Sequence, residues 1–126
     1  MNIVIQSIKH KNQRYDTAGD WFNIGGVDII CVSEVKNKDY EFLVGLHELV
    51  EMYLCKKRKI SDRRVCDFDK KFEKKRKKGN NDEPGDDPKA PYFDEHQFAT
   101  IIEKMMAKEL GVNWKKYDSI LVQRTK

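Results

Sequence analysis

The sequence predicts an α+β fold in which a small antiparallel sheet is packed by about three helices. Two β-prone runs, at residues 20–24 and 27–32, flank Gly25-Gly26, and an earlier run rich in Ile and Val covers residues 2–8. Patterns of helical period follow in the rest of the chain. A sheet with one covered face needs helices to pack on it, and the later segments supply them.

The predicted sheet occupies residues 2–33, as an N-terminal strand followed by a hairpin. Gly25-Gly26 is a hairpin signal because both positions tolerate a positive φ. The strand at residues 27–32 closely precedes the central helix, and an edge strand in that place can hold an extended peptide by strand addition. The alternative is that this strand belongs to the core.

The 126 residues fit one domain, spanning residues 1–126. Their 39% apolar and 37% charged content allows a modest core under a highly charged surface. No run approaches the roughly 20 apolar residues needed to span a bilayer. The N-terminus lacks the layout of a signal peptide, so we expect a cytoplasmic protein without a membrane partner. The cysteines form no CxxC pair, and we expect reduced thiols rather than disulfides.

The predicted helices have recognisable ends. Asn37 or Asp39 can cap the first of them through a side-chain oxygen. Pro91 suits the first turn of the last long helix, and Gly111 suits the position just after its end. A short segment that begins near Trp114 closes the chain. In order, the sequence predicts a central helix at 39–55, a basic helix at 61–76, an acidic loop at 79–90 and a last helix at 91–110.

The central helix is apolar on almost every side, yet it carries His47, Glu48 and Glu51. Burying a carboxylate without a partner is costly. His47 and Glu51 are four residues apart and therefore share a face. This is the layout of the zinc-protease helix His-Glu-x-x-His, with Glu51 in the place of the second His. It predicts a divalent metal, zinc in first place, on His47 and Glu51, with Glu48 as the general base.

The last helix offers a third ligand, because His96 and Glu103 fall on one of its faces. If this helix packs across the central one, His96 completes a set of two imidazoles and one carboxylate, which is typical of catalytic zinc. Glu95 or Glu103 would then orient one of the metal ligands by a hydrogen bond without contacting the metal itself. With Glu103 as the third ligand instead, manganese or iron would be favoured. The alternative without a metal is a hydrogen bond between His47 and Glu51, with His96 on the surface.

Two further features indicate ligands. Arg14 and Tyr15, ahead of the hairpin, are candidate contacts for a substrate or anion, because a guanidinium binds carboxylate or phosphate through two bonds. The segment from Lys56 to Lys78 holds thirteen basic and four acidic residues, a density that can neutralise nucleic-acid phosphates. Its polar face carries no aromatic side chains for stacking on bases, which favours a solvated face. The acidic loop at 79–90 is an alternative partner for these charges.

Several motifs resemble known families. They are Arg14-Tyr15-Asp16-Thr17-Ala18-Gly19-Asp20-Trp21, His47-Glu48-Leu49-Val50-Glu51, Glu83-Pro84-Gly85-Asp86, Ala90-Pro91-Tyr92 and Glu95-His96. Through them, over most of its length, the chain resembles a group of small phage and bacterial proteins. That resemblance implies one integrated domain, in the host cytoplasm if a phage encodes it, and no particular reaction. The strand, the central helix and the last helix more weakly resemble minimal zincin metallopeptidases, which implies a zincin-like layout. Glu51 replaces the second His of that family.

Three functions follow from these patterns. The first is a metal-dependent hydrolase of zincin-like type, acting on a peptide or protein. The second is a non-catalytic phage or host-interaction protein, in which the same residues form a structural metal site or a buried polar network. The third is a nucleic-acid-binding accessory protein that uses the basic segment.

Overall fold

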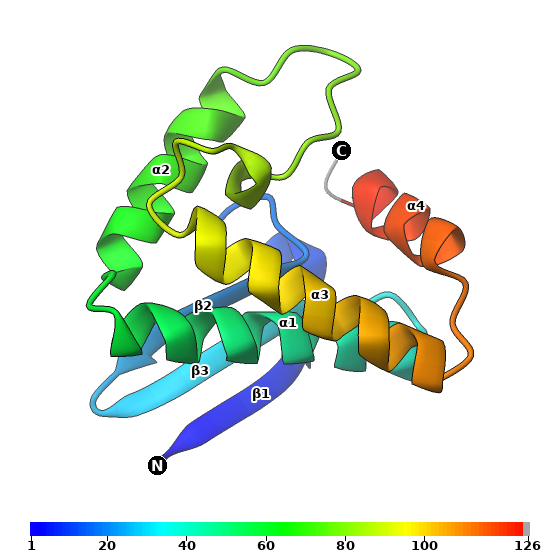
Figure 1. Cartoon of the computed structure of the whole chain (residues 1–126), viewed down its shortest axis with the longest axis horizontal. Coiled ribbons are helices and arrows are strands. Elements are labelled where there is room, and N and C mark those ends of the chain that lie inside the picture. The colour runs from blue at the N-terminus through cyan, green and yellow to red at the C-terminus, as the bar shows by residue number, and fades with distance from the viewer. Residues whose placement is uncertain (125–126) are drawn as a thin grey trace.

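A computed structural model describes residues 1–124 (Figure 1). The fold is α+β, as predicted: within these residues, a three-stranded sheet precedes four helices. The strands are β1 (Ile3–Ile8), β2 (Gly19–Ile24) and β3 (Val27–Ser33). The helices are α1 (Lys38–Lys57), α2 (Asp62–Lys74), α3 (Phe93–Glu109) and α4 (Trp114–Arg124), with short 3-10 turns η1 (His10–Asn12) and η2 (Pro84–Asp86).

The sheet has the strand order β1-β3-β2. The predicted hairpin is confirmed: β2 and β3 are antiparallel, and Gly25 and Gly26 have φ angles of 56° and 82°. β1, however, pairs with β3 in parallel, so the sheet is mixed rather than wholly antiparallel. The connection between β1 and β2 crosses the end of β3, where the His10 and Gln13 side chains bond Ser33 Oγ. The prediction that the strand at residues 27–32 is an edge strand is therefore wrong.

α1 packs on the sheet and is itself covered by α3, so it lies in the middle of the fold (Figure 1). Its apolar side chains Leu43 and Met52 are almost fully buried against Ile30 and Val32 of β3 and their neighbours in the core. This double coverage explains why the helix is apolar on almost every side. It also forces the polar residues of α1 that face α3 to find partners inside the protein.

Side-chain oxygens cap the first turns of α1 and α2, and Asn37 is the cap of α1, one of the two residues predicted for this position. Asn37 accepts a hydrogen bond from the backbone N–H of Tyr40, and Ser61 accepts one from that of Arg64. α3 begins two residues after Pro91. The predicted closing segment forms α4, which is preceded by Gly111 in a left-handed conformation.

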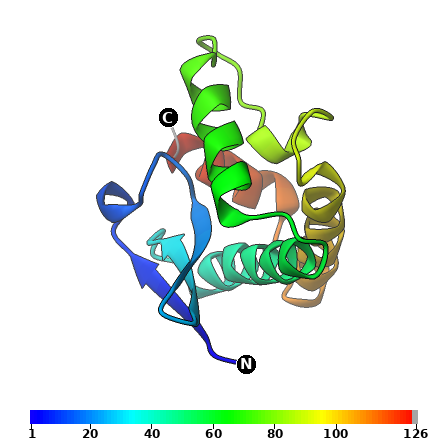
Figure 2. The same cartoon turned by 90° about the vertical axis from the view of Figure 1, so that its left-hand side faces the viewer.

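The acidic loop lies between the end of α2 and the start of α3. α2 rises steeply from the end of α1, and the loop with η2 leads from the far end of α2 to α3 (Figure 2).

The cysteines within the described chain are free and buried, as expected. In that same part of the chain, no helix has the length and apolar character needed to cross a bilayer.

Candidate metal centre

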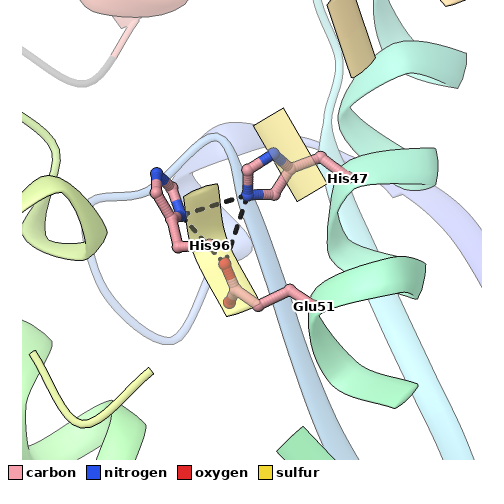
Figure 3. Close-up of side chains that lie close together, drawn as sticks. All are labelled: His47, Glu51 and His96. Carbon is pink, nitrogen blue, oxygen red and sulfur yellow. Dashed lines mark hydrogen bonds and ion pairs between the residues drawn. The ribbon is translucent and has the colours of Figure 1, made fainter. Parts of the chain in front are cut away.

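The structure brings the three predicted ligands together between α1 and α3 (Figure 3). His47 and Glu51 lie one turn apart on α1, with His47 Nε2 3.2 Å from Glu51 Oε2. His96, from α3, places its Nδ1 3.1 Å from His47 Nε2 and 2.9 Å from Glu51 Oε2. All three side chains are buried. They lie close enough to hold a metal ion.

The spacing of these atoms fits a first-row metal. A point equidistant from three atoms 2.9, 3.1 and 3.2 Å apart lies about 1.8 Å from each of them, slightly less than the zinc–nitrogen and zinc–oxygen bond lengths. An ion just outside their plane therefore reaches all three at bonding distance. Ligand atoms in a tetrahedral zinc site are about 3.3 Å apart, so only a slight opening is required.

A carboxylate lies on the outer side of each imidazole ring. His47 Nδ1 lies 2.7 Å from Glu103 Oε1, and Glu103 also accepts a hydrogen bond from Tyr117. This contact assigns the proton to Nδ1 and turns the Nε2 lone pair of His47 toward Glu51. On the other ring, His96 Nε2 lies 3.0 Å from the carboxylate of Glu83 but is not aligned with it for a hydrogen bond, while Nδ1 faces His47 and Glu51.

Glu51 completes the convergence. The indole N–H of Trp21 donates to its Oε1 at 3.1 Å, which leaves Oε2 directed at the two imidazoles. Three acceptor atoms thus meet at one buried point. Buried acceptors that face one another are unfavourable unless a positive charge or a proton lies between them.

Without a metal, a proton occupies this point. Burial alone lowers the pKa of His47, but hydrogen bonds to Glu103 and Glu51 outweigh it and raise that pKa to about 10. For Glu51, burial raises the pKa, yet the bonds from His47 and His96 lower it to about 2. The two facing ring nitrogens are too close for both to carry a proton, so the pair shares one. A metal ion must displace it, and we therefore expect metal affinity to rise with pH.

Glu48 lies on the neighbouring side of α1 and faces β2. Its Cγ and Oε1 pack against Gly19 so closely that a Cβ added there would be 2.7 Å from both. Together with the three ligands it lines a cavity of about 120 Å³. Among the side chains that the structure describes (residues 1–122), none forms a hydrogen bond with its carboxylate. Burial raises the pKa of Glu48 well above the ordinary range, and the charge of Glu51 adds to this effect.

The other predicted site residues divide into two groups. Glu103 contacts His47, as an orienting residue would, and lies outside the group of three ligand atoms. Glu95 is buried but turns away and accepts a hydrogen bond from Arg58 at 2.6 Å. The structure therefore does not place Glu95 where it could orient a metal ligand.

The two candidate anion contacts also differ. Arg14 donates two hydrogen bonds to Asp20, at 2.7 and 3.0 Å, and a third to Asp62. Its guanidinium is thus committed within the fold and does not line the cavity. Tyr15 does line the cavity, where its hydroxyl donates to Asp69.

Strand addition next to the metal position is blocked. β3 is paired on both sides, and the adjacent edge strand is β2. The carbonyl of Gly19 accepts a hydrogen bond from Thr17, and that of Trp21 accepts one from Arg14. These side chains cover carbonyls of β2 that an added peptide strand would need.

No protein-family model matches this chain, and no curated protein or solved structure is significantly similar to it. The resemblances to phage proteins and to zincins therefore depend on the sequence motifs alone. What the protein does has to be inferred from the chemistry of the centre itself.

Part of the basic segment is engaged within the fold. Lys56 pairs with Asp28 at 2.6 Å. Arg76 binds Glu73 through two nitrogens and also donates to two backbone carbonyls of the acidic loop. The loop thus contacts the segment through backbone carbonyls, whereas its acidic side chains Glu83 and Asp86 lie beside His96. Nucleic-acid binding stays a prediction of the sequence.

Some residues around the centre were not identified by sequence reasoning. Trp21 was expected in a β-prone run and at the end of the motif that begins at Arg14, and Tyr117 was expected only as part of the closing segment. Glu83 was placed in a loop that neutralises basic residues, although its motif precedes His96 closely. Asp69 and Tyr92 line the same cavity; Asp69 carried no signal of its own, and Tyr92 was noted only within the motif Ala90-Pro91-Tyr92.

Asp69 allows a test of the electrostatics beside the centre. Its carboxylate accepts hydrogen bonds from Tyr15 and Tyr92, but burial dominates and raises its pKa to about 7. Because this folded-state pKa lies above the unfolded value of about 3.9, its stability contribution is complete below pH 4. That contribution is lost as the pH rises through 7.

We expect Asp69→Asn, which mimics the protonated carboxyl, to remove this loss. The variant should match the natural protein near pH 4 and exceed its free energy of unfolding by about 1–4 kcal/mol at pH 8. Urea unfolding across this range measures the difference. A difference that does not change with pH would show that Asp69 titrates as an ordinary surface carboxyl.

Proposed function

We propose that this protein is a metal-dependent hydrolase. His47, Glu51 and His96 bind one divalent ion, with zinc as the first choice, and Glu48 is the general base. The observation that carries the proposal is the convergence of three buried acceptor atoms, with the outer nitrogen of each imidazole turned to a carboxylate. Metal-binding histidines in proteins commonly have such outer partners.

The ligand set favours zinc. Two imidazoles and one carboxylate are a common set in catalytic zinc sites, whereas a set dominated by carboxylates favours manganese or magnesium. Structural zinc sites have four protein ligands, but this centre supplies three and adjoins a cavity. An ion bound here supplies Lewis acidity and lowers the pKa of water in the open position.

Glu48 has the position and environment of a base. It adjoins the cavity beside His47, and it has no partner in the described chain that would occupy its carboxylate. Burial raises the pKa of Glu48 well above its ordinary range, and a divalent cation nearby would limit that rise and favour the charged carboxylate that accepts a proton. In this role Glu48 takes a proton from water as the oxygen attacks a substrate carbonyl, and then returns it to the leaving group.

Glu48→Gln tests the proposal. The amide preserves size but cannot accept the proton, so hydrolysis of activated esters and labelled peptides by the zinc-loaded protein should fall about 10²- to 10⁴-fold. Metal content by elemental analysis and the melting temperature should stay as in the natural protein.

The matched control is Glu95→Gln, which replaces a carboxylate that does not line the cavity. This variant should keep full activity. Equal activity of the Glu48→Gln variant would remove Glu48 from the mechanism. A natural protein that binds no metal at all after incubation with zinc would refute the proposal as a whole.

A further inference from the structure

A second group of metal-binding side chains uses the other face of the same imidazole. His96 Nε2 lies 3.0 Å from Glu83 Oε2 and 3.4 Å from Asp86 Oδ1. These three residues also offer ligand atoms close enough to hold an ion. We call this group the outer position, and the group of His47, Glu51 and His96 Nδ1 the inner position.

The nitrogen at the outer position lacks an aligned partner. The His96 residue is only 5% exposed, yet its Nε2 makes no hydrogen bond with proper geometry among the described residues. Both carboxylates lie near it but out of line with a ring N–H. A buried nitrogen with unsatisfied hydrogen bonding calls for an explanation, and a cation held between it and two carboxylates provides one.

The acidic turn holds the two carboxylates beside the ring. Glu83 precedes η2 and Asp86 ends it, while Gly85 between them packs directly on the imidazole. A hydrogen bond from Gln97 Nε2 to Asp86 Oδ1, at 3.1 Å, ties this turn to α3. The side chains of Glu83 and Asp86 are half exposed, whereas those of the inner position are buried.

One neutral imidazole has one lone pair, so it binds one ion at a time. An ion on Nε2 leaves the ring proton on Nδ1, where it is donated to Glu51 across 2.9 Å. An ion on Nδ1 leaves the proton on Nε2, facing Glu83 across 3.0 Å. The ring proton is therefore hydrogen-bonded to Glu51 when the ion is on Nε2, and lies near the negative charge of Glu83 when the ion is on Nδ1.

We propose that Glu83, Asp86 and His96 Nε2 form a loading site, where a divalent ion binds from solvent before it moves to the inner position. The proposal rests on metal binding at the inner position. As the ion moves from Nε2 to Nδ1, the ring proton moves from Nδ1 to Nε2, so the charge of the ring is unchanged. The exposed carboxylates raise the local concentration of cations beside a centre that is itself buried.

The test compares rates of metal association. We expect the double variant Glu83→Gln/Asp86→Asn to bind Co²⁺ at least tenfold more slowly than the natural protein. Binding is measured by stopped flow, through the visible absorption of cobalt at the inner position. The control is Asp82→Asn/Asp87→Asn, which removes the same charge from the same loop. It should bind at close to the natural rate. These substitutions leave the inner ligands intact, and circular dichroism checks the fold.

Each other result overturns the loading site. Equal slowing in both double variants would indicate general electrostatic attraction by the loop. An unchanged association rate with faster release would show that Glu83 and Asp86 only orient His96. If the natural protein itself takes up no cobalt, the inner position and the proposed function fail with it, which distinguishes that failure from the loss of the loading site alone.

Discussion

His47→Ala is expected to abolish tight metal binding. The change removes one of three ligands, so zinc affinity should fall by more than the 10- to 100-fold that the loss of an outer hydrogen-bond partner costs. The fold should survive, because Glu51 keeps its bond from Trp21 and Glu103 keeps its bond from Tyr117. Competition with a fluorescent chelator measures the affinity, and circular dichroism confirms the fold.

Two buried carboxylates of α3 provide a graded comparison for the same assay. Glu103→Gln removes the acceptor of His47 Nδ1 and should weaken zinc binding 10- to 100-fold. Glu95→Gln removes a carboxylate that binds Arg58 and should leave zinc binding unchanged. If the His47→Ala variant bound zinc as tightly as the natural protein does, the ion would have to bind somewhere else. Equal effects of the two Gln variants would mean that overall charge, rather than orientation of His47, controls binding.

Gly85→Ala is expected to damage stability and metal binding together. A Cβ at this position would lie 2.3 Å from His96 Cγ and 2.4 Å from Nδ1, far inside van der Waals contact. The ring cannot move away freely, because carboxylates flank both of its nitrogens. The turn must then retreat, at a cost of about 1–3 kcal/mol in the free energy of unfolding, typical of overpacking. Zinc affinity should fall in parallel as His96 shifts.

Lys89→Ala, in an exposed part of the same loop, is the matched control and should change neither property. Chemical unfolding gives the stability, and chelator competition gives the affinity. The backbone at Gly85 does not have a positive φ, so any loss reports the contact with His96 rather than backbone strain. Natural stability and affinity in the Gly85→Ala variant would contradict the close packing of the turn on the ring.

Helical periodicity predicted the centre of this site from the sequence. His47 and Glu51 share a face because they are four residues apart, and an apolar helix with such a face needs a partner for it. The pattern of His96 and Glu103 on a second helix then identified that partner, and α3 does pack on α1. Local patterns were sufficient here because the side chains that meet lie on regular helices.

Strand direction and the outer contacts were not predictable in this way. The alternation of residues in β1 is the same whether it pairs in parallel or antiparallel. The choice depends on the path of the loop that follows β1, which is fixed by bonds to Ser33 that no local pattern encodes. Asp69 and Tyr92 likewise meet only because α2 stands against the start of α3. Such contacts depend on tertiary packing rather than on the spacing of residues along the chain.

The volume of the cavity limits what can react there. About 120 Å³ is somewhat less than the 150 Å³ of an engineered cavity that accommodates a single benzene ring. Only a group of a few heavy atoms can therefore approach Glu48 and the imidazoles at once, while the bulk of any larger molecule stays outside. A hydrolase with this geometry would select its substrates by the size of the group that carries the bond to be cleaved.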